Sequence, residues 1–160
     1  MNRLLELLSE NAELTNAQLG AMLGMTEGEV AAAIADYEKK GIIKGYRAII
    51  NWDKTDETSV SALIELKVTP KRETGFDEMA KRVMMFDEVE SVYLMAGAYD
   101  LAVMVKGKTI QEIAMFVSKK LSTLDSVLST ATHFLLRRYK DGGAVLCDDD
   151  EPVDRRSMIL

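Results

Sequence analysis

The sequence predicts an α+β protein with two domains, a mainly helical N-terminal domain and a C-terminal domain with the order β-α-β-β-α-β. Three observations predict this fold class. Helix-capping motifs follow one another near the start of the chain, the polar stretch DKTDET lies at residues 53–58, and strand-like segments recur after it. Because the apolar pattern of the second half differs from that of the first, the domain boundary is placed at the polar stretch.

Two capping boxes predict the helices of the first domain. Thr15 with Gln18, and Thr26 with Glu29, fit the S/T-x-x-E/Q pattern, in which two backbone N–H groups without helical partners are satisfied reciprocally. A short turn with glycine at residues 23–25 lies between them, so this segment predicts a helix-turn-helix. An earlier helix supplies an apolar stripe against the pair, formed by Leu4, Leu5, Leu7 and Leu8.

The second helix of this pair is expected to end at Lys39-Lys40-Gly41, because basic residues followed by glycine are typical of a helix C-terminus. Residues 42–51 are predicted to form a β-hairpin or strand with a bend at Gly45. The N-terminal domain is therefore interpreted as a winged helix-turn-helix that spans residues 1–54.

The second half predicts four strands and two helices. Residues 61–68, 91–95, 101–105 and 130–139 are the expected strands. Apolar residues at helical spacing begin at Phe76 and again at Ile110. The order is that of a ferredoxin-like βαββαβ domain, with one antiparallel sheet and both helices on one face. It is assigned to residues 55–140.

The face of the sheet opposite the helices is also apolar. It carries Leu63, Tyr93, Met95, Ala102 and Met104. A monomer rarely exposes so large an apolar patch. The expectation is a homodimer formed through the sheets, and the alternative is that the N-terminal domain or the tail covers this face.

The tail, residues 141–160, is treated as an acidic C-terminal extension. It contains Gly142-Gly143 and four consecutive acids at 148–151, which are interpreted as a solvated loop. Residues 144–147 and 157–160 are apolar enough for short strands, and disorder is the competing interpretation.

Composition excludes several classes of protein. Of the 160 residues, 48% are hydrophobic and 29% charged, which favours a globular chain. No apolar run is long enough to span a membrane, and one cysteine, Cys147, allows no intrachain disulfide, so the expected location is cytoplasmic. His133 is the single histidine, and no carboxylate pair accompanies a nucleophile. We therefore expect no catalytic residues, no metal site and no cofactor.

Three segments resemble the Lrp/AsnC (feast/famine) family of amino-acid-responsive transcription regulators. They are LTNAQLGAMLGMTEGEVAAAIADYEKKGIIKGYRAIIN from Leu14, GAYDLAVMVKGK from Gly97 and STATHFLLRRYK from Ser129. The resemblance covers residues 1 to about 140. It implies a regulator that binds double-stranded DNA, responds to an amino acid or similar small effector, and assembles as a homodimer or a higher homo-oligomer up to an octamer.

The resemblance implies a DNA-binding surface around the helix-turn-helix. Hydroxyls, amides and free N–H groups at helix N-termini bond phosphates without a formal charge, and a basic cluster follows the second helix. The expected DNA-binding residues are Thr15, Asn16, Gln18, Thr26, Lys39, Lys40, Lys44 and Arg47.

The chain departs from the family in the first half of its recognition helix. Members often place Arg or Lys there, whereas this chain has Glu27, Gly28, Glu29 and the three alanines 31–33. Residues 1–54 hold six basic and eight acidic residues, a net charge of −2 that is unusual for a DNA-binding domain. The alternative function is thus an amino-acid-binding, oligomerising module with weakened or lost sequence reading.

The resemblance also implies an effector site at the loop between the second and third strands. Its expected residues are Gly97, Tyr99 and Asp100, together with Thr130 and Thr132 from the last strand of a neighbouring subunit. Gly97 permits positive φ or close backbone approach, and Asp100 is suited to an α-ammonium group. A simpler interpretation is that Gly97 and Asp100 only form the turn and Tyr99 packs at an interface. A branch of proteins with this layout resembles tetrapyrrole-modifying decarboxylases. The presence of a single histidine makes such an enzyme improbable here.

Overall fold

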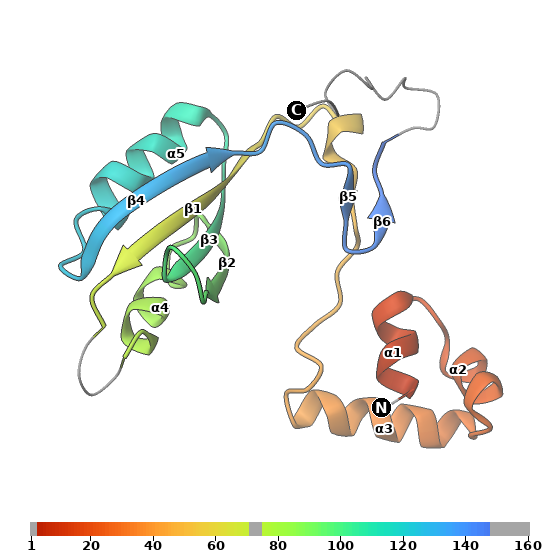
Figure 1. The fold of residues 1–160 in the computed structure, drawn as a ribbon. Coiled ribbons are helices and arrows are strands. Elements are labelled where there is room, and N and C mark those ends of the chain that lie inside the picture. Colours follow the sequence, from red (N-terminus) through yellow and green to blue (C-terminus); the bar gives the residue numbers. More distant parts are fainter. Residues whose placement is uncertain (1–2, 71–74, 148–160) are drawn as a thin grey trace. The chain divides into compact units, whose positions relative to one another are not determined.

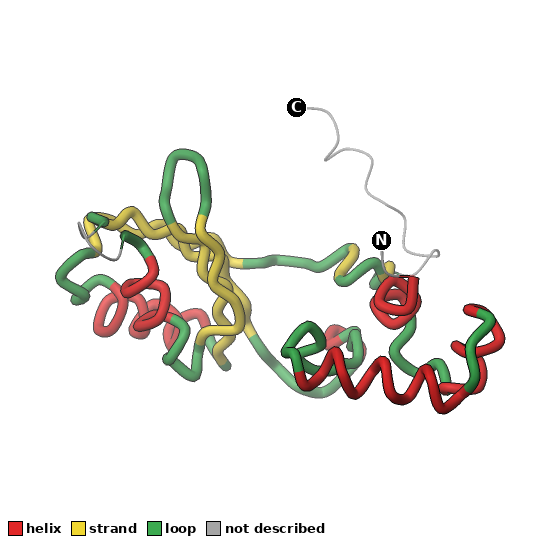
Figure 2. The backbone as a smooth tube through the Cα atoms, turned by 90° about the horizontal axis from the view of Figure 1, so that it is seen from below, coloured by secondary structure: helices red, strands yellow, loops and turns green. Residues whose placement is uncertain are grey.

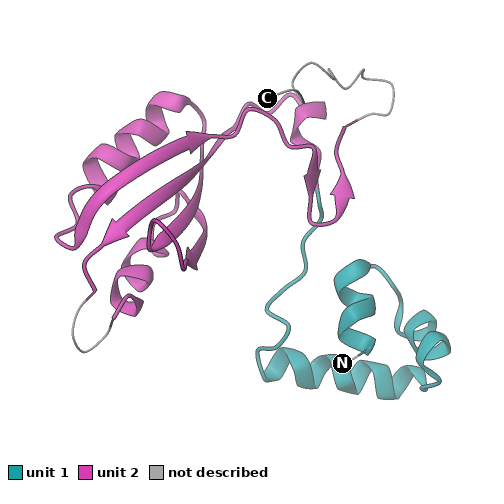
Figure 3. Cartoon of the chain, in the orientation of Figure 1, with its two compact units in different colours: residues 1–49 teal, residues 50–160 magenta. Residues whose placement is uncertain are grey.

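The computed structural model describes residues 3–70 and 75–147, and the chain divides into two compact units, Met1–Ile49 and Ile50–Leu160 (Figure 3). The division falls a few residues before the polar stretch at 53–58. The domain limits 1–54, 55–140 and 141–160 stay a prediction. The acids at 148–151 and the expected strand at 157–160 lie outside the described residues.

The first unit is built from three helices, α1 (Arg3–Glu10), α2 (Asn16–Leu23) and α3 (Glu27–Lys39), as Figure 1 shows. Both predicted capping boxes are present, with Thr15 preceding α2 and Thr26 preceding α3. One apolar cluster joins the three helices, and its buried members are Leu4, Leu7, Leu8, Leu19 and Val30. The predicted helix-turn-helix with a supporting first helix is therefore confirmed.

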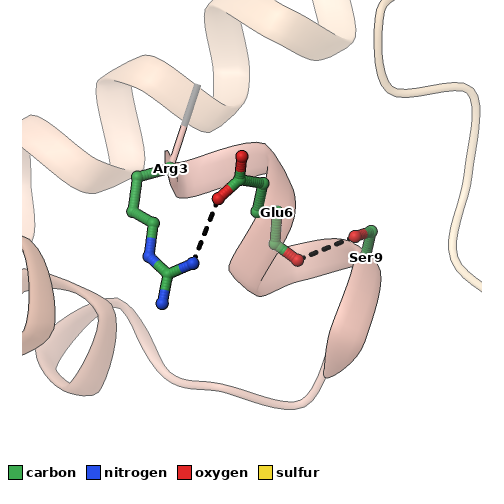
Figure 4. Close-up of polar contacts among 3 residues, drawn as sticks. All are labelled: Arg3, Glu6 and Ser9. Atoms are coloured by element: carbon green, nitrogen blue, oxygen red, sulfur yellow. Dashed lines mark hydrogen bonds and ion pairs between the residues drawn. The ribbon is translucent and has the colours of Figure 1, made fainter. Parts of the chain in front are cut away.

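Figure 4 shows a short polar network among residues of the first helix. The Arg3 guanidinium lies 3.0 Å from Glu6 Oε2, and the Ser9 hydroxyl donates to the Glu6 carbonyl at 2.7 Å. The Arg3 side chain is largely exposed, so this ion pair contributes little to stability. The fold of this unit depends instead on its leucine cluster.

The turn between α2 and α3 depends on two glycines. Gly24 has φ 68°, the left-handed conformation that ends α2. Gly20 is buried, and its carbonyl accepts the Met25 N–H at 2.9 Å. A Cβ atom on Gly20 would lie 2.6 Å from the Met25 carbonyl oxygen, so the chain can pass this point only without a side chain.

The prediction of a strand or hairpin at residues 42–51 is wrong. Gly41, with φ 67°, ends α3, and the N–H groups of Ile42 and Ile43 return to the Tyr37 carbonyl. No residue from 42 to 51 is in a strand, and Tyr46, Ile49 and Ile50 are exposed. A strand forms only where a second backbone edge accepts its hydrogen bonds, and the described chain offers none to this segment.

The second unit is a four-stranded antiparallel sheet with the order β2-β3-β1-β4. The strands are β1 (Val60–Val68), β2 (Val89–Leu94), β3 (Leu101–Gly107) and β4 (Val127–Phe134). Helix α4 (Asp77–Val83) connects β1 to β2, and α5 (Ile110–Phe116) continues as a π-helix, Val117–Leu121, before β4. This is the predicted ferredoxin-like order.

The core lies between the sheet and its helices, which occupy one side of the strands (Figure 2). Alternate residues of β1 are fully buried, namely Ala62, Ile64, Leu66 and Val68. They pack with Met79 and Val83 of α4 and with Ile113 and Phe116 of α5. Burial of a side chain of this size contributes about 1.5–3 kcal/mol, so the central strand anchors the unit.

The last strand is shorter than predicted. The sequence suggests 130–139, whereas β4 starts at Val127 and ends at Phe134, paired with Ala62. After Phe134 the Leu135 N–H still donates to the Ser61 carbonyl at 2.9 Å, and no pairing of residues 136–139 with β1 follows, so the strand ends close to the start of β1 at Val60.

A two-stranded hairpin follows, formed by β5 (Lys140–Asp141) and β6 (Ala144–Val145) around the positive-φ pair Gly142 and Gly143. It bears out the short strand expected within residues 144–147. The Asn51 amide donates to the Leu146 carbonyl at 2.7 Å, and this bond ties the hairpin to the short 3₁₀ helix Trp52–Lys54.

Replacement of Gly20 tests the close packing of the helix-turn-helix. Gly20→Ala should lower the free energy of unfolding by about 1–3 kcal/mol, because the new methyl group overlaps the Met25 carbonyl. Gly28→Ala is the matched control: nothing lies within 4 Å of its Cβ position, and the gain in helix propensity should stabilise by about 0.5–1 kcal/mol. Urea unfolding followed by far-ultraviolet circular dichroism measures both. Equal stability of Gly20→Ala and wild type would contradict the close approach.

Candidate DNA-binding surface and effector loop

The exposed surface of α3 has a strip of small residues between carboxylates. Val30 is buried, and Ala33, Ile34 and Tyr37 are half-buried toward the other helices. The exposed small residues Gly28, Ala31, Ala32 and Ala35 lead along the helix to Lys39, the one basic residue of α3. The exposed acids of the same helix are Glu27, Glu29, Asp36 and Glu38.

Capping bonds occupy the polar groups at the two helix N-termini. The Thr26 hydroxyl donates to Glu29 Oε2 at 2.8 Å and accepts the Glu29 N–H at 3.3 Å. Thr15 makes the same pair of contacts with Gln18, at 3.1 and 3.2 Å. The hydroxyls and the Gln18 amide oxygen therefore have helical partners in the chain, although both threonines are exposed.

Glu29 is a capping residue. Its carboxylate accepts the Thr26 N–H at 2.8 Å, and this backbone bond, followed by the Thr26 hydroxyl, lowers the pKa of Glu29. The group stays ionised at neutral pH and favours the positive end of the α3 dipole. The acid that the sequence places in the recognition helix thus has a defined structural role.

A basic flank follows the recognition helix. We use this term for Lys39, Lys40, Lys44 and Arg47, all exposed. The Lys40 ammonium lies 2.6 Å from Asp36 Oδ2, and this hydrogen bond raises the pKa of Lys40. The Lys44 side chain folds over Gly41, where its Nζ would lie 2.8 Å from a Cβ atom. The structure therefore gathers at least Lys40 and Lys44 around the C-terminus of α3.

Residues 95–100 join β2 to β3, and because the effector is expected there we call them the effector loop. Asp100 closes this loop. The Met95 N–H donates to the Asp100 carbonyl at 2.8 Å, and the Asp100 N–H donates to the Leu66 carbonyl at 3.0 Å. Asp100 Oδ2 accepts the N–H of Val68, the last residue of β1, at 2.8 Å. Asp100 thus fixes the end of the central strand, a role that sequence reasoning missed.

Gly97 shows neither the positive φ nor the close backbone approach that the sequence analysis expected of it. Its φ is not positive, and nothing lies within 4 Å of its Cβ position. The backbone conformation and the local packing therefore do not require glycine there. Gly97 is exposed and Tyr99 is half-buried.

The threonines of β4 lie across β1 from the loop. Thr130 pairs with Leu66 and Thr132 pairs with Ile64, so both face the helix side of the sheet. Asp100 contacts Leu66 from the other edge of β1. Within one chain, the central strand separates the two groups of expected effector residues.

The pairing of the strands brings together residues that the sequence analysis assigned to the opposite face of the sheet. Leu63 lies beside Met104, and Tyr93 lies beside Ala102. His133 Nε2 is 3.2 Å from Glu65 Oε1 on this face, which fits a structural role for the histidine. Among residues 3–70 and 75–147 no cluster of metal-binding side chains occurs, and no helix there is long and apolar enough to cross a bilayer.

The fold combines a helix-turn-helix unit, in which α3 and a basic flank are exposed, with a βαββαβ unit. This layout is that of regulators that pair a DNA-binding domain with a sensor domain, and the comparisons with known proteins decide whether the chain is one. A model of the Lrp/AsnC ligand-binding domain matches residues 61–145, and a model of a winged helix-turn-helix DNA-binding domain matches residues 2–44. The chain belongs to the Lrp/AsnC family, and it is a transcription regulator of that type.

Known proteins resemble the chain over nearly its whole length. An uncharacterized HTH-type transcriptional regulator, YugG of Bacillus subtilis (strain 168), is 48% identical over 157 residues, which is 98% of this chain and 93% of YugG. A proline dehydrogenase transcriptional activator of Rhizobium radiobacter is 28% identical over 141 residues, 88% of this chain and 90% of the activator. A transcriptional regulator of Neisseria meningitidis, solved as a complex with L-Met, shares the fold with a TM-score of 0.68 and 21% identity, covering 87% of this chain and 89% of its own.

Removal of the Asp100 carboxylate tests its structural role. Asp100→Ala leaves the Val68 N–H without its acceptor, and the free energy of unfolding should fall by about 1–3 kcal/mol. Asp100→Asn keeps an acceptor oxygen, so its free energy of unfolding should fall much less. Urea unfolding measures stability, and hydrogen exchange at the Val68 amide reports the local change. An unchanged exchange rate in Asp100→Ala would show that the bond is unimportant.

Proposed function

We propose that the protein is a cytoplasmic, homo-oligomeric regulator that binds double-stranded DNA through α2, α3 and the basic flank, and that an amino acid bound at the effector loop modulates this binding. The observation that carries the proposal is the exposed strip of small residues on α3, which ends next to the basic flank. An α-helix of this kind fits the major groove, and cations at its end neutralise phosphates on one side of the groove.

The proposed contacts are of two kinds: contacts to phosphates that position the protein on the duplex, and contacts to bases that read its sequence. Lys39, Lys40, Lys44 and Arg47 contact phosphates, and other phosphates lie at the positive dipole ends of α2 and α3, beside Thr15, Asn16 and Thr26. The N–H groups of Thr15 and Thr26 themselves are donated to Gln18 and Glu29. Base reading falls to the Gln18 amide nitrogen and to the alanines of α3, whose methyl groups fit thymine methyls. Because each phosphate contact adds about 0.9 to the slope of log K against log salt, the contacts of a whole dimer are expected to make binding weaken steeply as salt rises.

We further propose a homodimer through the open face of the sheet, with higher homo-oligomers built from it. Tyr93 is 55% exposed and Met95 41% exposed there, and Leu63 and Met104 form an apolar pair beside them. Burial of this face against a second copy removes the apolar area from water. A dimer also presents two recognition helices to one duplex, as palindromic operators require.

The effector is proposed to be an amino acid held by Gly97, Tyr99 and Asp100, with Thr130 and Thr132 of a neighbouring subunit. The ligand-binding domain match and the relative solved with L-Met support this class of ligand. Asp100 commits Oδ2 to Val68, and its second oxygen is the one proposed to accept an ammonium group. No catalytic activity and no cofactor are proposed.

One observation favours the second candidate, an amino-acid-binding and oligomerising module that reads DNA weakly. The first turn of α3 carries Glu27 and Glu29 and no basic side chain. Because Glu29 stays ionised, it repels phosphates near that end of the helix. Sequence preference in a DNA-binding assay separates the two candidates.

Salt dependence tests the DNA-binding surface. In gel shifts on the upstream region of its own gene, Lys44→Gln and Lys39→Gln should each flatten the slope of log K against log salt by about 1.8 for a dimer, since each phosphate contact contributes about 0.9. Lys81→Gln on the exposed surface of α4 is the matched control. Binding to random duplex as tight as to the upstream region, even at low salt, would favour the second candidate.

Ligand screening tests the effector proposal. One of the twenty common L-amino acids should stabilise the full chain by about 2.7 kcal/mol at a concentration a hundredfold above its Kd, as binding to the folded state alone requires. Asp100→Asn should abolish this stabilisation and keep the fold, whereas Asp87→Asn, at an exposed acid before β2, should retain it. Thermal unfolding measures the effect, and no response to any amino acid would contradict the proposal.

A further inference from the structure

A hollow of about 320 Å³ lies in the second unit, at the end of the sheet where β1 begins and β4 has ended. Figure 1 shows the chain entering β1 and the chain leaving β4 side by side there, and the Leu135 N–H donates to the Ser61 carbonyl at 2.9 Å. Its volume is at the low end of the range of about 300–1,000 Å³ for small-molecule sites. The effector loop lies at the other end of β1, next to Val68.

Arg138 is the main charged group of this hollow. Its side chain is half-buried, and Nη2 donates to the hydroxyl of the buried Ser61 at 2.7 Å. Within the described residues, no carboxylate pairs with this guanidinium. A guanidinium has five N–H donors in a fixed fork, so most of them remain available to a planar anion. Partial burial of an unneutralised cation favours the binding of a carboxylate.

Two carboxylates line the same hollow. Asp53 and Glu57 are both exposed, and no basic residue of the described chain is paired with either. Their backbone N–H groups are fixed by Asn51 and Thr55, at 3.2 and 3.4 Å. Within the described residues, no ion pair neutralises Arg138, Asp53 or Glu57, so the hollow offers one cation and two anions to a ligand. Arg137 also lines the hollow, and its guanidinium lies over the Tyr139 ring.

Part of the remaining wall is apolar, and threonine and serine residues form the rest. Trp52 begins the 3₁₀ helix, the Thr55 hydroxyl donates to its carbonyl at 2.8 Å, and the Lys106 ammonium lies 4.4 Å from its ring centre. Val60 and Leu135, both half-buried, complete the apolar part. Together they give an aliphatic side chain a surface to cover.

The geometry points to a second ligand site in this hollow, distinct from the effector loop, for a small zwitterion with a carboxylate, an ammonium group and a short apolar side chain. Arg138 holds the carboxylate, Asp53 and Glu57 hold the ammonium group, and Trp52 packs against the side chain. The site lies within one chain and requires no residue of a partner.

Trp52 is the single tryptophan of the chain, so its fluorescence reports on this hollow. The full-length protein is titrated with each of the twenty common L-amino acids while emission is followed. At least one should give a saturable change. Arg138→Met should weaken it by about tenfold or more, as loss of a charged hydrogen bond requires. Arg82→Met removes the same charge beside Thr69, at the far end of β1, and should leave it unchanged.

A second variant covers the case in which Arg138→Met does not fold, which circular dichroism checks. Asp53→Asn combined with Glu57→Gln alters only exposed side chains. It should weaken binding of the amino acid and leave binding of the matching carboxylic acid without the amino group unchanged. Equal losses for both ligands would overturn the assignment of the ammonium group.

The outcomes separate this inference from the effector proposal. If calorimetry shows amino-acid binding that Asp100→Asn abolishes and Arg138→Met does not change, while Trp52 emission stays constant, the second site is overturned and the effector loop stands. If binding and the Trp52 response survive Asp100→Asn but not Arg138→Met, the second site is supported. If none of the twenty amino acids binds wild-type protein, both sites are overturned.

Discussion

Pairing of the central strand β1 on both edges is the constraint on which the second unit depends. Its alternate residues form the floor of the core under α4 and α5, and its backbone bonds to β3 on one side and to β4 on the other. Side-chain bonds fix both ends, through Asp100 to Val68 and through Arg138 to Ser61. The two candidate ligand sites are therefore attached to opposite ends of one rigid element, separated by roughly 23 Å for seven strand residues. A ligand bound at either end would contact a strand that the packing of the core keeps in place.

The first unit achieves its shape with few side chains on the surface that faces a DNA duplex. The capping boxes use the hydroxyls and the acidic or amide side chains at both helix N-termini for the chain itself. The outer face of α3 carries a strip of alanine and glycine between exposed acids, and positive charge is confined to the end of the helix and the residues after it. If this strip enters the groove as proposed, it would contact thymine methyl groups more readily than guanine edges, which arginine reads best.

Local patterns predicted most of the fold. The capping boxes at Thr15 and Thr26 and the alternation from Ala62 to Val68 are properties of neighbouring residues, and the structure has them as expected. The strand at 42–51 and the end of β4 were wrong because a strand needs a partner that its own residues do not specify. The contacts that organise the candidate sites join positions 32 and 77 residues apart, Val68 with Asp100 and Ser61 with Arg138. No periodicity reveals such contacts, although two consecutive arginines at the end of the predicted last strand were a signal for Arg138.

The carboxylate of Asp100 has a consequence for how proteins of this kind diversify. It holds the terminal N–H of β1, so any replacement without an acceptor loosens the sheet whatever the loop binds. Its neighbours Gly97 and Ala98 are exposed, and the position of Gly97 has open space around it. Substitutions at these neighbours would therefore change the loop at little cost in folding, whereas substitution of Asp100 costs stability whatever ligand the loop binds. Retention of this aspartate in a related regulator would then say nothing about which ligand that regulator prefers.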